Sequence, residues 1–296
     1  MIVRPSALGV TALAPAKLNL FLEVLGKRPD GYHEIETLMV AVDLYDTLEF
    51  IDDPSGDVTL TCDDPSLPVD GRNLVVKAAL RLRAEANVDR GVKISLHKEI
   101  PAQAGLGGGS SDAAATLRAL DLLWGTGLGD ERLGRLAGEI GSDVAFFLHG
   151  PAAICRGRGE RVEAVEMSTP LHFVLICPPV GVSTAAAFGA LVVPSEPRPI
   201  GPAVAALGDA DALGPLLYNR LQAAAEAVEP SLAQTRELLK DHGPPHLSGH
   251  LMSGSGSAHF GLARDLSAAR NAAEALRRRG PGRVRVVSCE PRDHLA

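Results

Sequence analysis

Residues 101–115 read Pro101-Ala102-Gln103-Ala104-Gly105-Leu106-Gly107-Gly108-Gly109-Ser110-Ser111-Asp112-Ala113-Ala114-Ala115, a glycine run that opens directly into an alanine-rich helix. The glycines permit positive φ angles and let the backbone approach a ligand closely, so several N–H groups can point at one anion. Ser110, Ser111 or Asp112 is the expected cap of the helix, whose first turn would face the same anion. The stretch predicts a phosphate-binding loop, and a plain flexible turn is the alternative.

Neither of the two common phosphate signatures fits this loop. A dinucleotide fingerprint would need an acidic residue about 20 positions later, at the end of a second apolar strand, and none stands there. A Walker motif would need a lysine directly after the glycines, and no lysine follows them. The loop therefore points to another class of phosphate site.

Composition limits the kind of partner. The chain has 296 residues, of which 46% are hydrophobic, enough for a large core and two domains. Its net charge of −7 argues against nucleic acid or an anionic membrane as a partner. No apolar run of membrane-spanning length occurs. An anionic small molecule would therefore need a local cationic pocket.

The cysteines are scattered at positions 62, 155, 177 and 289 without a C-x-x-C pair. This spacing argues against a zinc site and favours reduced thiols. We expect a cytoplasmic protein without a structural metal or disulfide.

The segment from Ala14 to Val24 alternates as a strand with one buried face, formed by leucines. Lys17 and Asn19 lie two residues apart on the other face and project the same way. That face is either solvated or part of a polar site.

The other patterns predict strands and helices in alternation. Asn73 is the expected cap of a helix over 74–85, and Gly141 is the expected C′ glycine of a helix over 131–140. Further helices are expected at 112–124, 185–191, 203–207, 216–228, 231–241 and 266–279. Strands are expected at 38–42, 47–51, 58–61, 92–96, 152–155, 161–165, 173–177, 258–263 and 284–288.

Two further features carry functional side chains. Asp143 is a lone carboxylate before an apolar segment, so it is either a cap or a working group. The turn Pro29-Asp30-Gly31 presents Tyr32 beside His33, an aromatic face next to a hydrogen-bonding imidazole. The alternative for this pair is ordinary packing of the tyrosine and a surface histidine.

Three separated segments match the motifs of one known superfamily: Pro15-Ala16-Lys17-Leu18-Asn19, the 101–115 loop and Ser253-Gly254-Ser255-Gly256. Together they resemble, in order, the motifs of the galactokinase, homoserine kinase, mevalonate kinase and phosphomevalonate kinase superfamily. Lys17-Leu18-Asn19-Leu20, Asp30-Gly31-Tyr32-His33-Glu34, residues 105–115 and Gly141-Ser142-Asp143-Val144 are most similar to its branch acting on a cytidyl substrate. Positions 102 and 103 depart from the glycine expected at the start of the loop.

The resemblance implies an α+β fold with a ribosomal-S5-like N-terminal domain, here 1–165, and a ferredoxin-like C-terminal domain, 166–296. The site would lie in the cleft between them. The implied reaction moves the γ-phosphoryl group of ATP, with Mg²⁺, to the 2-hydroxyl of 4-diphosphocytidyl-2-C-methyl-D-erythritol in non-mevalonate isoprenoid biosynthesis. A homoserine or mevalonate-type kinase is one alternative, and a non-catalytic nucleotide sensor on the same fold is another.

The resemblance also implies roles for individual residues. Asp143 would accept the proton of the attacking hydroxyl, and Lys17 would keep that carboxylate ionised. ATP would be bound by Asn73, Lys98, Pro101, Ala102, Gln103, Ala104, Gly105, Leu106, Gly107, Gly108, Gly109, Ser110 and Ser111. The cytidyl substrate would be bound by Asn19, Tyr32, His33, Asp143, Thr184 and Phe188. We expect a monomer or homodimer with a small-molecule substrate and no nucleic acid or membrane partner.

Overall fold

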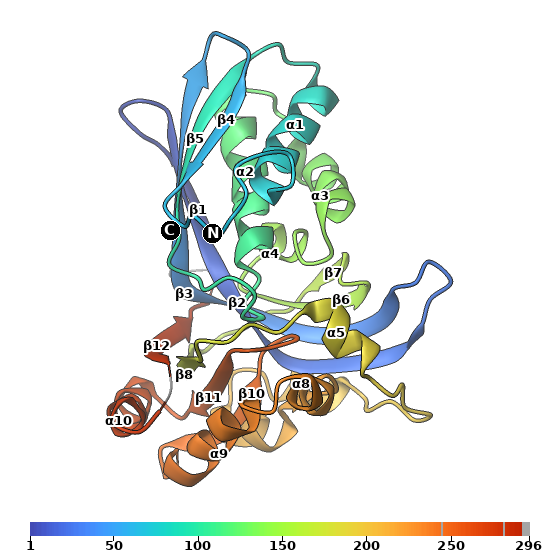
Figure 1. Ribbon diagram of the computed structural model, residues 1–296, viewed down its shortest axis with the longest axis vertical. Helices are drawn as coiled ribbons and strands as arrows, with labels where there is room; N and C mark the ends of the chain where they lie inside the picture. Colours follow the sequence, from blue (N-terminus) through green and yellow to red (C-terminus); the bar gives the residue numbers. More distant parts are fainter. Residues whose placement is uncertain (244, 281, 292–296) are drawn as a thin grey trace.

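The computed structural model describes residues 1–243, 245–280 and 282–291 and contains two β-sheets (Figure 1). The first sheet has the order β1-β2-β3-β5-β4, with β6 and β7 continuing from β3 and β9 pairing with β2. Its strands are β1 (Ile2–Pro5), β2 (Val10–Lys27), β3 (His33–Asp53), β4 (Val58–Cys62), β5 (Gly91–His97), β6 (Ala152–Gly157), β7 (Arg161–Ala164) and β9 (Tyr218–Asn219).

Helices cover one face of this first sheet (Figure 1). They are α1 (Leu74–Ala86), α2 (Gly108–Trp124), α3 (Gly129–Ile140) and the short α4 (Phe146–His149). Their buried faces share one apolar cluster with β2, β3 and β5, and α2 is buried on most sides. The glycine run thus leads into the most central helix of this half.

The second sheet has the antiparallel order β10-β11-β8-β12. Its strands are β8 (Leu171–Cys177), β10 (Leu247–Met252), β11 (His259–Ala263) and β12 (Arg283–Cys289), and α9 (Leu232–His242) and α10 (Leu266–Arg277) pack on it. Between β8 and β10 lie α5 (Thr184–Gly189), α6 (Gly201–Ala205), α7 (Ala210–Leu213), η1 (Gly214–Leu216) and α8 (Gln222–Val228). This strand order is the ferredoxin-like arrangement, and the α+β prediction is confirmed.

A second apolar cluster joins the two sheets. Leu18 and Leu20 of β2 are fully buried and belong to the same cluster as Phe173 and Phe260 of the second sheet. Burying a side chain of this size stabilises the fold by about 1.5–3 kcal/mol. The predicted leucine face of β2 therefore packs against the C-terminal half and fixes the space between the two halves.

The N-terminal strands are longer than predicted. Residues 38–42 and 47–51 belong to one strand, β3, which continues through a register shift opposite Pro15 and Ala16. Asp43 and Leu44 have no partner on β2, and such a bulge does not end the strand, so the polar positions Asp43 and Asp46 do not mark a loop. The β2–β3 hairpin extends well beyond the sheets (Figure 1).

The predicted helix over 216–228 is only partly correct. Tyr218 and Asn219 form β9, which pairs in parallel with Phe21 and Leu22 of β2, and the helix begins only at Gln222. The Asn219 amide also donates to the carbonyl oxygens of Met252 and Gly254 at 2.8 Å each. These long-range contacts override the local helical pattern.

The two predicted helix ends differ in outcome. Asn73 caps α1 as predicted, because its Oδ1 accepts the N–H of Val75 at 2.9 Å. Helix α3 ends at Gly141 as predicted, but this glycine has an extended backbone, φ −173°, and not the left-handed conformation common at C′. No helix in the described part of the chain is long and apolar enough to cross a membrane.

Candidate active site

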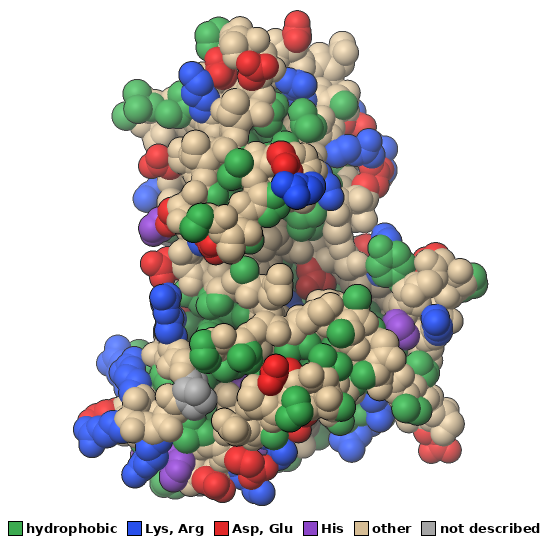
Figure 2. Space-filling view, in the orientation of Figure 1, with side chains coloured by type: hydrophobic (Ala, Val, Ile, Leu, Met, Phe, Trp, Pro, Cys, Tyr) green, Lys and Arg blue, Asp and Glu red, His purple; other side chains and the backbone are tan. Residues whose placement is uncertain are grey.

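A cavity of about 1310 Å³ lies at the waist of the molecule, which is hollowed in the space-filling view (Figure 2). It is lined by β2, the β2–β3 hairpin, the glycine loop, the start of α5 and the 254–255 turn. All but one of the predicted site residues line it: Lys17, Asn19, Tyr32, His33, Asn73, Lys98, Pro101, Ala102, Gln103, Ala104, Gly105, Leu106, Gly107, Gly108, Gly109, Ser110, Asp143, Thr184 and Phe188. The structure therefore brings three distant motifs to one place.

Ser111 is the exception. Its side chain is fully buried, it does not line the cavity, and its Oγ has no hydrogen-bond partner among the described residues. Successive helical residues point in different directions, so Ser110 faces the cavity and Ser111 faces the core.

The glycine loop leaves a helix end open toward the cavity. Helix α2 begins at Gly108, and its N-cap Gly107 has a φ of +71° and supplies no side-chain cap. The predicted caps Ser110, Ser111 and Asp112 are therefore wrong, because the helix starts before them. A helix of this length with uncapped N–H groups and a positive dipole end is suited to bind an anion.

Gly105 shows why the loop needs glycine. Its φ is +75°, and a Cβ at this position would lie 2.1 Å from the Ser253 carbonyl oxygen. The Ser253 hydroxyl donates to the Gly105 carbonyl oxygen at 3.0 Å and accepts the N–H of Asn19 at 3.3 Å. Any larger residue would separate the two loops.

Lys17, Asn19 and Asp143 form the polar centre of the cavity. The Lys17 ammonium donates to Asn19 Oδ1, and its Nζ lies 3.8 Å from Asp143 Oδ2. The Asn19 amide donates to Thr37 Oγ1 at 2.8 Å. Lys17 and Asn19 are only 3% and 2% exposed, so a solvated strand face is excluded.

Burial and charge act in opposite directions on Lys17. Burial lowers the pKa of its ammonium, and the negative charge of Asp143 opposes that shift. A Cβ on Gly254 would lie 3.0 Å from Lys17 Nζ, so the second glycine-serine turn packs against the ammonium. Lys17 is thus enclosed by elements from both halves of the chain.

Lys98 belongs to a buried charge cluster below the glycine loop. Its Nζ pairs with Asp46 and lies 2.8 Å from Asp112 Oδ2. Asp46 Oδ1 also accepts the N–H groups of Glu99 at 2.7 Å and Ile100 at 2.9 Å. The cluster therefore ties β3, the entry to the loop and α2 together, and sequence analysis did not predict the two carboxylates.

The cluster predicts a pH effect on stability. Burial raises the pKa of Asp112 to about 7. The positive charge of Lys98 opposes this rise, and the negative charge of Asp46 adds to it. The folded protein holds this proton up to about pH 7, whereas an unfolded Asp releases it near 3.8. The free energy of unfolding contributed by Asp112 therefore falls as pH rises between these values.

Asp112→Asn cannot lose a proton, so its stability relative to the wild type is expected to increase as pH rises from about 4 to about 7. Denaturant unfolding of both proteins across this range measures the difference, to which groups remote from position 112 contribute equally. A difference that does not change with pH would contradict the assigned shift.

The predicted aromatic pair lies at the hairpin end of the cavity. Tyr32 follows a turn in which its N–H donates to Asp30 Oδ1 at 3.1 Å, and it is 52% exposed. His33 stacks on Phe188, with ring centroids 4.9 Å apart and planes 25° from parallel. A base using that face of Phe188 would have to displace His33.

Three cationic residues of the cavity were not predicted: Lys27, Arg72 and Arg158. Arg158 lies in the turn between β6 and β7, and its Cζ is 4.8 Å from the centre of the Tyr32 ring. The sequence offers one signal, a basic residue between two glycines in the segment that joins the strands predicted at 152–155 and 161–165.

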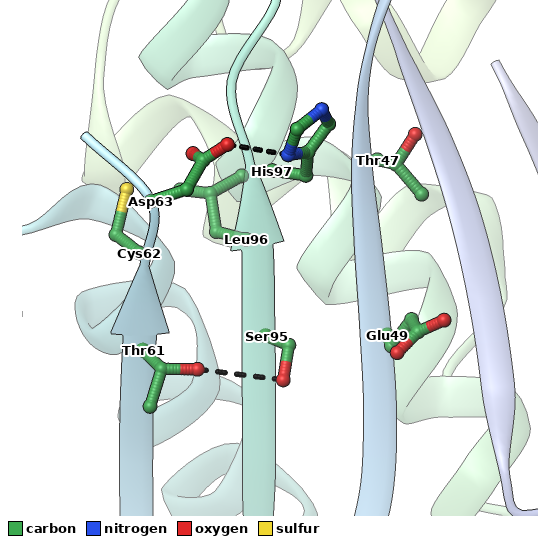
Figure 3. Close-up of a pocket in the computed structure, with 8 residues that line it drawn as sticks. All are labelled: Thr47, Glu49, Thr61, Cys62, Asp63, Ser95, Leu96 and His97. Carbon is green, nitrogen blue, oxygen red and sulfur yellow. Dashed lines mark hydrogen bonds and ion pairs between the residues drawn. The ribbon is translucent and has the colours of Figure 1, made fainter.

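A second hollow, of about 510 Å³, lies on the sheet face away from the helices (Figure 3). His97 Nδ1 pairs with Asp63, and Thr61 Oγ1 lies 3.4 Å from Ser95 Oγ. The predicted site residues do not line it. Because its polar groups already bond to one another, we place the functional site in the larger cavity.

Comparison with known proteins identifies the family of the chain. Residues 73–151 match the family model described as GHMP kinases N terminal domain, and residues 203–282 match the model GHMP kinases C terminal. A 4-diphosphocytidyl-2-C-methyl-D-erythritol kinase from Pelotomaculum thermopropionicum is 45% identical over 273 residues, covering 91% of this chain and 94% of the relative.

Two solved structures extend the comparison. The crystal structure of a 4-(cytidine 5'-diphospho)-2C-methyl-D-erythritol kinase is 39% identical with a TM-score of 0.78, covering 94% of this chain and 98% of that one. A homoserine kinase from Cytophaga hutchinsonii has a TM-score of 0.76 at 22% identity, covering 98% and 97%. At that identity the homoserine kinase supports a shared fold alone.

Proposed function

Because the chain belongs to the GHMP kinase family, within its 4-diphosphocytidyl-2-C-methyl-D-erythritol kinases, we propose that it transfers the γ-phosphoryl group of ATP to the 2-hydroxyl of that cytidyl diphosphate. The product would enter non-mevalonate isoprenoid biosynthesis. The observation that carries the proposal is the Lys17 Nζ to Asp143 Oδ2 distance of 3.8 Å inside the cavity that the uncapped end of α2 faces.

The glycine loop fits the phosphates of ATP. Residues 101–110 line the cavity, and the free N–H groups at the start of α2 supply donors and a positive dipole end. Asn73 and Lys98 would form the wall around the adenine, with Ser111 supporting the helix from the core side. Mg²⁺, when held with ATP at the glycine loop, would offset the charge of the phosphates.

The reaction needs a proton acceptor near the attacking hydroxyl. As the bond between the hydroxyl oxygen and the γ-phosphorus forms, the bond to the leaving oxygen of ADP breaks, and Asp143 would take the hydroxyl proton. The Lys17 ammonium, 3.8 Å from Asp143, would offset charge on the moving phosphoryl group. Asn19, held by Thr37, would orient the substrate hydroxyls.

The acceptor would lie between the hairpin and α5. Once His33 has moved off the Phe188 ring, Tyr32 and Phe188 would stack on the cytosine, and His33 would hydrogen-bond to its edge. Thr184 begins α5, and its Oγ1 lies 2.9 Å from Ser255 Oγ. This contact would hold the acceptor side close to the second glycine-serine turn.

Tyr32→Ala is expected to raise KM for the cytidyl substrate about 5- to 150-fold, because one stacking partner is worth roughly 1–3 kcal/mol. KM for ATP should change little, since the glycine loop binds that nucleotide. Tyr32→Phe keeps the ring and should stay close to the wild type. Steady-state kinetics with each substrate varied gives both constants, and equal weakening of both substrates would indicate a folding defect instead.

The proposal is tested by ADP release from ATP with three acceptors: the cytidyl diphosphate, homoserine and mevalonate. We expect release with the cytidyl substrate alone. If the protein phosphorylates homoserine or mevalonate and leaves the cytidyl substrate unchanged, the proposed acceptor is wrong. Binding of ATP without release of ADP in any mixture would favour a nucleotide sensor.

The setting of the enzyme is also proposed. The two domains would divide at residue 165/166, between β7 and β8. The chain would act in the cytoplasm on a small molecule, as a monomer or homodimer, without nucleic acid or membrane partners. Its net charge of −7 and its scattered cysteines support this setting.

A further inference from the structure

The proposed acceptor is a diphosphate ester, so its anionic centre needs a cation in the acceptor half of the cavity. Most cations lining the cavity have partners. Lys17 contacts Asn19 and Asp143, Lys98 pairs with two carboxylates, and Arg72 pairs with Asp70. Lys27 and Arg158 form no ion pair within the described part of the chain, and Arg158 acts on Asp30 only through its charge. Lys27 is exposed, whereas Arg158 is partly buried in the turn between β6 and β7.

That turn is built on two glycines. Gly157 has a φ of +77° and Gly159 a φ of +122°, and the N–H of Arg158 donates to Glu160 Oε2 at 2.6 Å. A Cβ on Gly159 would lie 3.3 Å from Asp143 Oδ1, so the turn backbone packs directly against the proposed base. The position of Arg158 is therefore fixed relative to Asp143.

The Arg158 side chain runs from this point toward Tyr32. Its guanidinium lies over the Tyr32 ring, 4.8 Å from the centre, and makes one long hydrogen bond, 3.5 Å, to the Gly138 carbonyl oxygen. Arg158 thus spans the two ends of the proposed acceptor site, with the base at Tyr32 and the reacting hydroxyl at Asp143. The diphosphate of the acceptor joins the same two ends.

We propose that Arg158 binds the diphosphate of the acceptor and thereby selects nucleoside diphosphate esters over neutral alcohols; this inference rests on the proposed function. A guanidinium presents a planar fork of N–H donors that matches phosphate oxygens, and a charged hydrogen bond is stronger than a neutral one. The contact with Tyr32 holds the side chain in place before the acceptor enters. One face of Tyr32 remains for the base.

Arg158→Met is expected to raise KM for the cytidyl substrate about 10- to 100-fold, with kcat and KM for ATP nearly unchanged. Arg158→Lys keeps the charge and loses the fork, so it should recover part of the loss. Arg161→Met is the matched control, because Arg161 lies on the same hairpin, pairs with Glu34 and does not line the cavity. It should behave like the wild type.

Binding measurements separate this inference from the proposed reaction. Calorimetry should show that Arg158→Met weakens the binding of cytidine diphosphate and leaves the binding of cytidine unchanged. Equal weakening of cytidine diphosphate and cytidine binding would assign Arg158 to the base and overturn the proposal. Unchanged binding of both ligands would also overturn it. A wild type that binds cytidine diphosphate through Arg158 but releases no ADP would remove the proposed function and keep the diphosphate site.

Discussion

Asp143→Asn is expected to lower kcat about 10²- to 10⁴-fold, the usual contribution of a positioned general base. Asparagine preserves the shape of the side chain but cannot accept the hydroxyl proton. The Asp143 side chain is 31% exposed and its nearest charged partner, Lys17 Nζ, is 3.8 Å away, so the fold should not depend on it. Single-turnover and steady-state kinetics should both show the loss.

The control for this variant is Asp89→Asn, which changes an exposed carboxylate outside the cavity. Asp89→Asn should keep wild-type kinetics, and all three proteins should melt at similar temperatures. A kcat near the wild-type value for Asp143→Asn would remove Asp143 from the mechanism.

Lys17→Met should reduce kcat to a comparable extent, about 10²- to 10⁴-fold, because the reacting groups lose their fixed positive charge. Methionine retains most of the buried volume of the lysine side chain, so the loss of charge is measured without a large cavity. Burial lowers the pKa of Lys17, with Asp143 opposing. The variant has no ammonium to desolvate on folding, so its free energy of unfolding should not fall greatly.

The readout is kcat together with the denaturant midpoint. A large loss of kcat at a nearly unchanged midpoint supports the catalytic role. A variant with near-wild-type kcat would exclude it, and a variant that fails to fold would be followed by Lys17→Arg, which restores the charge but not the compact ammonium.

Local chemistry was predictable from the sequence. Asn73 caps α1 because its side chain and the first turn of the helix are adjacent in the chain. Lys17 and Asn19 share one face because residues two apart in a strand do so. The glycine run also predicts the open helix end at Gly107. The exact start of α2 was not predictable, because Gly108 and Gly109 themselves belong to the helix.

Contacts between distant residues were not predictable in the same way. Asp46 is 52 positions from Lys98, and only the fold of β3 brings the two together. The bulge opposite Pro15 and the pairing of β9 with β2 likewise depend on tertiary packing. A role for Arg158 was not predictable, because a glycine-flanked arginine in a hairpin turn has no motif of its own.

The most direct test of the central claim is ³¹P NMR of the product formed from ATP and 4-diphosphocytidyl-2-C-methyl-D-erythritol. The 2-carbon is tertiary and carries no hydrogen, so a phosphate ester there lacks the three-bond coupling to a carbinol proton. We predict a new phosphomonoester resonance without that coupling, together with an intact diphosphate and ADP. A resonance coupled to a carbinol proton, or no new ester while ADP accumulates, would contradict the proposed transfer.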